Sequence, residues 1–227
     1  MDRMHYTVEY AAVQPDLESW TSPAWAQADM LQIAHFRPES SDHRPRTHAR
    51  LLYDADALYG MFRVEDRYVR CTRTSYMSDV YRDSCVELFV QPKPERGYFN
   101  FEFNCGGALL CSHVVDPTRT PDGFVDFTRL PERDGRQVTV HPSLPAVVEP
   151  EIREPIEWTL AFSIPFALLA KYVGPIGPVA GQTWRANLFK CAEDNSHPHW
   201  AAWSPVDELN FHLPRCFGTI QFAHAPR

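Results

Sequence analysis

The chain has 227 residues, 44% of them hydrophobic and 13% aromatic, which is enough for a sizeable core within one large β domain. Its formal net charge is −7 and its basic residues form no block, so nucleic acid and anionic membranes are poor candidate partners. Twenty prolines against ten glycines favour many short strands with stiff turns over long helices.

We therefore expect a single domain over residues 1–227, with residues 1–45 forming an N-terminal arm and the first strand. Residues 17–31 carry Trp20 and Trp25 and are expected to form an irregular arm or a short helix whose tryptophans pack on the outside of a sheet. The next part of the chain alternates between apolar runs and turn residues. It predicts a strand over 33–36, a hairpin of strands 48–53 and 57–64, and a polar connection over 67–79.

The clearest pattern is a pair of alternating runs on either side of a Pro-rich turn. In residues 98–104, Phe99, Phe101 and Phe103 alternate with polar residues, so one face of this strand packs a core and the other face is polar. Residues 85–90 alternate in the same way and predict an antiparallel hairpin. The polar face is either an ordinary solvated surface or a ligand site, and the Asn content favours the site because Asn is depleted in strands. The polar residues that this hairpin would gather are Asp83, Glu87, Asn100, Glu102 and Asn104.

The second half of the chain adds strands, one helix and a loop rich in reactive side chains. Pro165 follows an alternating run and suits the first position of a short helix over 166–171. The loop over 192–205 contains His197, His199 and two tryptophans. Overall we predict an all-β, antiparallel, jelly-roll-like sandwich with one or two short helices. The expected strands are 108–114, 138–141, 157–164 and 183–191, with a loop over 116–126, and residues 211–212 and 217–222 close the chain.

The N-terminus and the cysteines indicate in which cellular compartment the protein works. Residues 1–6 show no charged-then-apolar leader, which indicates a cytoplasmic protein, or a secreted or periplasmic one given without its leader. The six cysteines contain no CxxC pair, which argues against a structural zinc site. We expect reduced and mostly buried thiols. Cys105 and Cys111 are the one pair expected to face each other, across a glycine turn.

A series of short motifs runs in order from about Ala49 to Phe222. The motifs are Leu58-Tyr59, Val64-Glu65-Asp66, Asp83 to Val90, Tyr98 to Asn104, Trp158 to Pro165, Trp184 to Asn187, Trp203-Ser204-Pro205 and Phe217 to Ile220. Together they resemble the family 9 carbohydrate-binding modules and their bacterial relatives in the DOMON-like superfamily. This resemblance implies a β-sandwich that binds sugars, often at a glycan chain end between aromatic rings. It also implies calcium in some members and a link to polysaccharide degradation.

Sugar chemistry favours particular side chains here. A pyranose has an apolar C–H face that suits an aromatic ring, and hydroxyls that suit Asn, Glu and Arg. We expect a mono- or oligosaccharide ligand, with one of Trp200 and Trp203 in the site and the other in the core. The paired tryptophans of the family have no residue-by-residue counterpart, and Tyr76 or Tyr81 is where we look for the aromatic partner. The candidate ligand-binding residues are Tyr81, Arg82, Glu102, Asn104, Arg185, Asn187, Trp200 and Trp203.

Calcium is the one cofactor that we expect, because several turn carboxylates are oxygen ligands of the kind that a hard cation prefers. Each of them is also an ordinary turn residue. A zinc site is not favoured, since His212 would have to be brought to His197 and His199 by tertiary structure alone. The candidate calcium ligands are Asp54, Asp56, Asp66 and Asp83.

Two other functions stay open beside non-catalytic sugar binding, for which no catalytic residue is expected. A sugar-active hydrolase or lyase would use Glu102, His113 and His199, because His titrates near neutral pH and a carboxylate can orient it. A heme-binding domain is the third alternative, since relatives in the same sandwich superfamily bind heme. Its candidate ligands would be Met61, Met77, His113 and His199. The argument for heme rests on analogy between folds.

Overall fold

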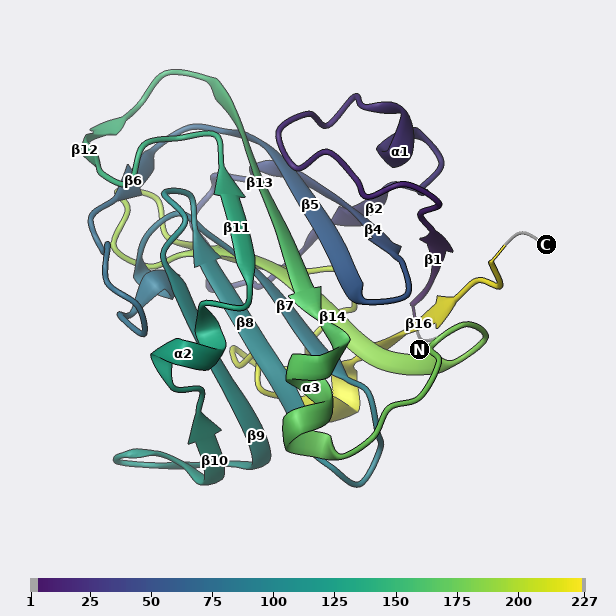
Figure 1. Ribbon diagram of the computed structural model, residues 1–227. Helices are drawn as coiled ribbons and strands as arrows, with labels where there is room; N and C mark the ends of the chain where they lie inside the picture. Colours follow the sequence, from purple (N-terminus) through teal and green to yellow (C-terminus); the bar gives the residue numbers. More distant parts are fainter. Residues whose placement is uncertain (1–3, 226–227) are drawn as a thin grey trace.

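The computed structural model describes residues 4–225 as two sheets packed face to face, with three short helices at their edges (Figure 1). Sheet A contains β1 (His5–Tyr10), β3 (His35–Phe36), β7 (Cys85–Gln91), β8 (Tyr98–Asn104), β9 (Leu109–Thr120), β10 (Gly123–Arg129), β14 (Thr183–Ala192), β15 (His199–Ala202) and β16 (Gly218–Phe222). Sheet B contains β2 (Leu31–Ile33), β4 (Arg46–Tyr53), β5 (Ala57–Asp66), β11 (Thr139–Pro142) and β13 (Ile156–Pro165). A separate pair consists of β6 (Val69–Cys71) and β12 (Val148–Ile152), and the helices are α1 (Pro23–Ala26), α2 (Glu132–Gly135) and α3 (Phe166–Val173).

Strand β1 joins the two sheets. Sheet A runs in the order β10-β9-β8-β7-β14-β16-β1, and sheet B continues from β1 as β4-β5-β13-β11. Residues 5–8 of β1 pair in parallel with β16, and residues 9–10 pair in parallel with β4. The other strand pairs are antiparallel, which gives each sheet one face for the core and one face for other uses.

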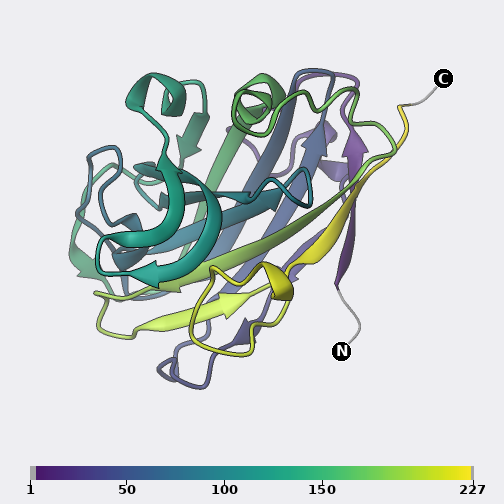
Figure 2. The same cartoon turned by 90° about the horizontal axis from the view of Figure 1, so that it is seen from below.

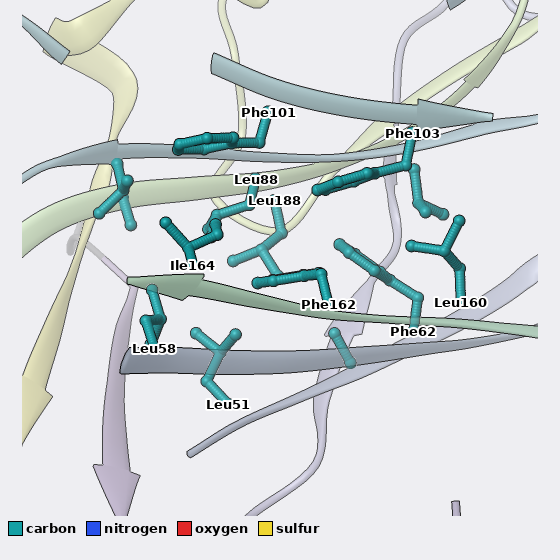
Figure 3. Close-up of a cluster of buried hydrophobic side chains, with 14 of the residues drawn as sticks. Leu51, Leu58, Phe62, Leu88, Phe101, Phe103, Leu160, Phe162, Ile164 and Leu188 are labelled. Atoms are coloured by element: carbon teal, nitrogen blue, oxygen red, sulfur yellow. The ribbon is translucent and has the colours of Figure 1, made fainter. Parts of the chain in front are cut away.

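The core forms where the apolar faces of the two sheets interdigitate (Figure 3). Phe101 and Phe103 of β8 point down from sheet A, and Phe62 and Phe162 point up from sheet B. The rings of Phe103 and Phe162 stack with their centroids 5.2 Å apart. Gly60 of β5 leaves room for this ring, because a Cβ at that position would lie 2.1 Å from Cζ of Phe162.

The N-terminal arm covers the outer face of sheet B. Trp25 of α1 is fully buried against Leu52, Tyr59 and Met61, and its Nε1 donates a hydrogen bond to the carbonyl of Asp16 at 2.7 Å. Burial of such large rings stabilises the fold by a few kcal/mol each. The outer face of sheet A is covered in part by residues 206–217, which pack on Phe89, Tyr98 and Phe189, and another part of this face is open to a ligand.

The structure confirms the predicted all-β antiparallel sandwich with short helices. The central hairpin, the hairpin of β4 and β5, and the helix after Pro165 all form where the sequence predicted them. None of the helices among residues 4–225 is long and apolar enough to cross a membrane.

Three local predictions were wrong. The expected loop over 116–126 is instead the end of a long hairpin made by β9 and β10. Residues 5–10 of the expected arm form β1, which was not predicted. Cys105 does not face Cys111, because Cys111 pairs across the ladder with Phe101 and its Sγ lies 3.3 Å from the hydroxyl of Tyr76.

Candidate functional site

The outer face of sheet A carries a cavity of about 850 Å³. Small-ligand sites generally have volumes of roughly 300 to 1,000 Å³. Its floor is made by side chains that alternate along β7, β8, β9 and β14, since every second residue of a strand points to the same face. Its walls come from the β9–β10 hairpin, which curves away from the sheet in Figure 2, and from residues 209–212.

Two carboxyl groups lie side by side on the cavity floor. Glu87 of β7 and Glu102 of β8 are direct cross-strand partners, with only 2% and 4% of their surfaces exposed. Nδ2 of Asn100 donates to Oε1 of Glu102 at 2.7 Å, while Oδ1 of Asn100 accepts from the backbone N–H of Ser112 at 3.1 Å. The Asn100 amide is therefore fixed at both ends, and it orients the Glu102 carboxyl.

Burial sets the protonation of this pair. Burial is the largest cause that raises the pKa of Glu87, and the nearby Cys191 and Glu102 add to it. Burial also raises the pKa of Glu102 to about 7, although the hydrogen bond from Asn100 and the charge of Arg119 each lower it. A protonated carboxyl donates one hydrogen bond, whereas an ionised one only accepts. The floor therefore offers both donors and acceptors near neutral pH.

Aromatic rings stand around these carboxyl groups. Tyr81, from a short 3₁₀ turn (Val80–Arg82), and Trp200 of β15 line one part of the cavity. Nε1 of Trp200 donates to Oε1 of Glu193 at 3.4 Å. On the hairpin wall, the guanidinium of Arg119 lies 4.5 Å from the ring centroid of Phe124. The cavity thus combines exposed ring faces with planar polar groups.

His212 closes one corner of the cavity. It lines the cavity but is only 8% exposed, and its Nδ1 lies 2.8 Å from the hydroxyl of Tyr98. Burial, reinforced by the charge of Arg119, lowers its pKa to about 3. His212 is therefore neutral at physiological pH and can donate or accept a hydrogen bond without adding charge.

Three of the eight candidate ligand-binding residues line this cavity: Tyr81, Glu102 and Trp200. Arg82 lies outside the cavity lining and forms ion pairs with Asp79 and Asp194, at 3.7 and 3.6 Å.

The remaining candidates serve the framework of the fold. Oδ1 of Asn187 accepts from the N–H of Ser204 at 2.8 Å, and Nδ2 of Asn187 donates to the Ser204 carbonyl at 2.9 Å. Arg185 donates to the carbonyl of Phe217 at 2.9 Å. Trp203 is 2% exposed within the core. Trp200 therefore lines the cavity, whereas Trp203 lies in the core.

The polar residues of the central hairpin also divide into two sets. Glu87, Asn100 and Glu102 line the cavity. Asn104 and Asp83 lie apart from the cavity lining, where Nδ2 of Asn104 donates to Oδ2 of Asp83 at 2.9 Å. This second set fixes the start of the hairpin to the polar connection before it.

The structure does not bring the acid–base candidates together. His113 and His199 lie at strand positions that alternate with cavity-lining residues, so they face the opposite side of sheet A from Glu102. Nε2 of His113 contacts the carbonyl of Arg96 at 2.6 Å, and Nε2 of His199 lies 2.8 Å from Nζ of Lys190. Burial lowers the pKa of both histidines.

The four calcium candidates lie in three places, and the carboxylates of Asp54, Asp66 and Asp83 accept hydrogen bonds from protein donors. Asp54 and Asp56 share the turn between β4 and β5, where Oδ1 of Asp54 caps two backbone N–H groups. The carboxylate of Asp83 accepts two hydrogen bonds from Arg73, one from its backbone N–H and one from its guanidinium, both at 2.9 Å. Calcium binding by Asp54, Asp56, Asp66 and Asp83 stays a prediction.

Asp66 belongs to a buried polar network. Its Oδ1 lies 2.7 Å from Nε2 of His43, and its Oδ2 accepts from Nε1 of Trp158 at 3.2 Å and lies 3.7 Å from Nζ of Lys190. Burial opposes the charged form, but Lys190 and His43 outweigh it and lower the pKa of Asp66 to about 2. This carboxylate therefore acts as the counter-ion of a buried lysine.

The heme candidates are also separate. Met61 packs under the N-terminal arm, Met77 lines the cavity, and His113 and His199 lie on the opposite face of sheet A. Axial heme ligation needs side chains directed at one iron, and these four do not converge on one point.

Sequence reasoning missed part of the cavity wall. Arg119 and Phe124 come from the segment 116–126 that was expected to be a loop, Phe127 comes directly after it, and Phe211 comes from the last segment before β16. A signal was present, because two phenylalanines and an arginine within a Pro/Gly-rich stretch are unusual for a purely solvated loop. Cys191 and Glu193, at the end of β14 and just beyond it, were also missed.

Comparison with known proteins identifies the family. Residues 24–222 match carbohydrate-binding family 9, and the chain belongs to this family. No curated protein matches the chain.

Solved structures share the fold. A provisionally assigned carbohydrate-binding protein from Bacteroides uniformis ATCC 8492 superposes with a TM-score of 0.84 at 23% identity, over 97% of this chain and 100% of that one. A family 9 module from Caldicellulosiruptor kristjanssonii in complex with cellotriose gives 0.67 at 12% identity, over 98% and 95% of the chains. A family 9 module from the same organism in complex with glucose gives 0.66 at 14% identity, over 98% and 97%.

Proposed function

We propose that this protein is a non-catalytic carbohydrate-binding module that holds the end of a glycan in the cavity of sheet A. The observation that carries the proposal is the composition of the cavity. Accessible rings at Tyr81 and Trp200 stand beside a buried floor of Glu87, Asn100 and Glu102. Rings and planar hydrogen-bonding groups are what the two kinds of surface of a pyranose require.

The rigidity of the floor supports this proposal. Asn100 and Glu102 are held by hydrogen bonds inside the sheet, so little conformational freedom is left to lose when a sugar binds. A sugar hydroxyl that meets a buried carboxylate gains a charge-assisted hydrogen bond. Because the hairpin wall and residues 209–212 bound the cavity, a chain end fits better than the middle of a long polymer.

The placement of the carboxyl groups favours binding over hydrolysis. Glycosidases place two carboxyl groups on either side of the scissile bond. Glu87 and Glu102 instead lie next to each other on one floor, and the nearest histidine in the lining, His212, is held neutral. The cavity thus supplies recognition groups without an opposed acid and base.

The first ligands to test are glucose and cellotriose, because these are bound by the family 9 modules from Caldicellulosiruptor kristjanssonii. Calorimetric titration would compare the wild type with Trp200→Ala and with Trp203→Phe. We expect Trp200→Ala to weaken binding about tenfold, since a ring contact is worth roughly 0.5 to 1.5 kcal/mol beyond the area that it buries. Trp203→Phe should lower the melting temperature and leave the affinity of the folded protein unchanged.

Two outcomes would overturn the proposal. Equal affinity of the wild type and Trp200→Ala would show that the sugar binds elsewhere. Chromatography of the sugar after long incubation tests the enzyme alternative. A new product that disappears with Glu102→Gln would make the protein a hydrolase or lyase, whereas an unchanged sugar supports a binding module.

A further inference from the structure

A cluster of two thiols and a carboxyl group lies at one end of the cavity floor. Cys85 of β7 and Cys191 of β14 are direct cross-strand partners, and Glu87 is two residues from Cys85 on the same face. Sγ of Cys191 lies 3.1 Å and Sγ of Cys85 lies 3.9 Å from Oε1 of Glu87. These three atoms all lie within 4.8 Å of one another, and all three residues are buried.

The Glu87 carboxyl has an unusual set of partners. Among residues 4–225, its hydrogen bonds come only from the thiols of Cys85 and Cys191, and no amide, hydroxyl or cationic side chain reaches it. Thiols are weak donors, and a buried carboxyl without strong partners is costly. Every other buried carboxylate described here has a nitrogen donor, as Asp66 and Asp83 illustrate.

The geometry points to a metal site, and we propose that Cys85, Glu87 and Cys191 bind a thiophilic divalent cation of the zinc type. In tetrahedral zinc sites the metal lies about 2.3 Å from sulfur and about 2.0 Å from oxygen, which separates neighbouring ligand atoms by roughly 3.5 to 3.8 Å. The two sulfur–oxygen distances of 3.1 and 3.9 Å straddle that separation. Small side-chain rotations would therefore complete the coordination.

The cavity supplies a route to this site and its fourth ligand. Glu87 and Cys191 both line the cavity, so an ion can enter from solvent. Three protein ligands and one open position are typical of zinc sites that bind water or another small ligand. The soft sulfur atoms select zinc-type metals over calcium, which prefers oxygen ligands. This inference does not rest on sugar binding.

Cobalt is the probe for this site, because Co²⁺ occupies zinc sites and its thiolate complexes absorb light. Reduced, chelator-treated protein would be titrated with Co²⁺, and then with Zn²⁺ as a competitor. We expect one Co²⁺ per chain, with a thiolate-to-cobalt charge-transfer band that Zn²⁺ removes. Cys85→Ser and Cys191→Ser should lose the band. Cys111→Ser is the matched control, because its buried thiol lies outside the cluster, and it should keep the band.

A second measurement needs no variant. In mild denaturant, Zn²⁺ should slow alkylation of Cys85 and Cys191 relative to the other four cysteines, as read by peptide mass spectrometry. The inference is overturned if wild-type protein binds no Co²⁺, if the band persists in both variants, or if Zn²⁺ protects none of these thiols. A Cys85–Cys191 disulfide in unreduced protein would also overturn it. Sugar titration of Cys85→Ser separately tests the binding proposal, so the two can fail independently.

Discussion

The buried carboxyl group of Glu102 on the cavity floor makes the stability of the fold depend on pH. Its pKa of about 7 in the folded protein compares with 4.5 in an unperturbed carboxyl, and burial is the main cause. The folded state therefore binds more protons than the unfolded state between pH 4.5 and 7. Its contribution to stability is present below pH 4.5 and is lost as the pH rises through 7.

Glu102→Gln tests this pH dependence. Glu102→Gln removes the titration but keeps the shape and the contact with Asn100. The free energy of unfolding of the variant, relative to the wild type, should rise by up to about 3 kcal/mol between pH 4.5 and pH values above 7, since each pKa unit is worth about 1.4 kcal/mol. Urea unfolding across this range measures the difference. A difference that does not change with pH would show that Glu102 titrates normally.

The outer part of the β9–β10 hairpin, residues 115–129, contributes less to the core than residues 109–114 at the start of β9. Most of its residues from 115 to 129 are at least partly exposed, and its ladder shifts register between Phe124 and Phe127. Phe124 lines the cavity, whereas its neighbour Val125 is 58% exposed. The hairpin can therefore contribute to ligand contact with little effect on global stability.

Substitutions on this hairpin test that role. Phe124→Ala should weaken sugar binding several-fold, because it removes a ring and the stacking surface of Arg119, and should change the melting temperature little. Val125→Ala is the matched control and should leave both quantities unchanged. Calorimetric titration and thermal unfolding of the two variants provide the comparison. Equal affinities would remove the hairpin from the site.

The elements also show how far the sequence could predict the structure. The central hairpin was predictable because Phe99, Phe101 and Phe103 alternate strictly on a buried face. The β9–β10 hairpin was not, because Pro117 and Pro121 indicate a loop and no core imposes an alternation there. The pairing of Cys191 with Cys85 depends on β14 lying beside β7, a contact between distant segments that local pattern does not encode.

In the whole molecule, the two sheets differ in what lies on their outer faces. The N-terminal arm packs on the outer face of sheet B, and the outer face of sheet A carries the cavity beside residues 206–217. The strand pattern and the family resemblance predicted the sandwich, but neither showed which face would carry the cavity. Trp25 is the residue that fixes the arm, since it is fully buried between the arm and sheet B.

We therefore expect that a substitution in the arm changes the free energy of unfolding without changing the affinity for sugar. Trp25→Ala should lower the free energy of unfolding by about 3 to 5 kcal/mol, as expected for deletion of a buried aromatic side chain. The fraction that stays folded should bind sugar with unchanged affinity. Denaturant unfolding combined with titration at low temperature measures both. A parallel loss of affinity would show that the arm shapes the cavity.

Sugar binding in the cavity beside Trp200 can be tested with the indole N–H signals of the six tryptophans. A nitrogen–proton correlation spectrum would be recorded while cellotriose is added, with Trp200→Phe used to assign one signal. We expect the Trp200 signal to shift until the site is saturated, while the signals of buried Trp25, Trp158, Trp184 and Trp203 stay in place. A spectrum in which Trp200 is unmoved while another indole signal shifts would contradict it.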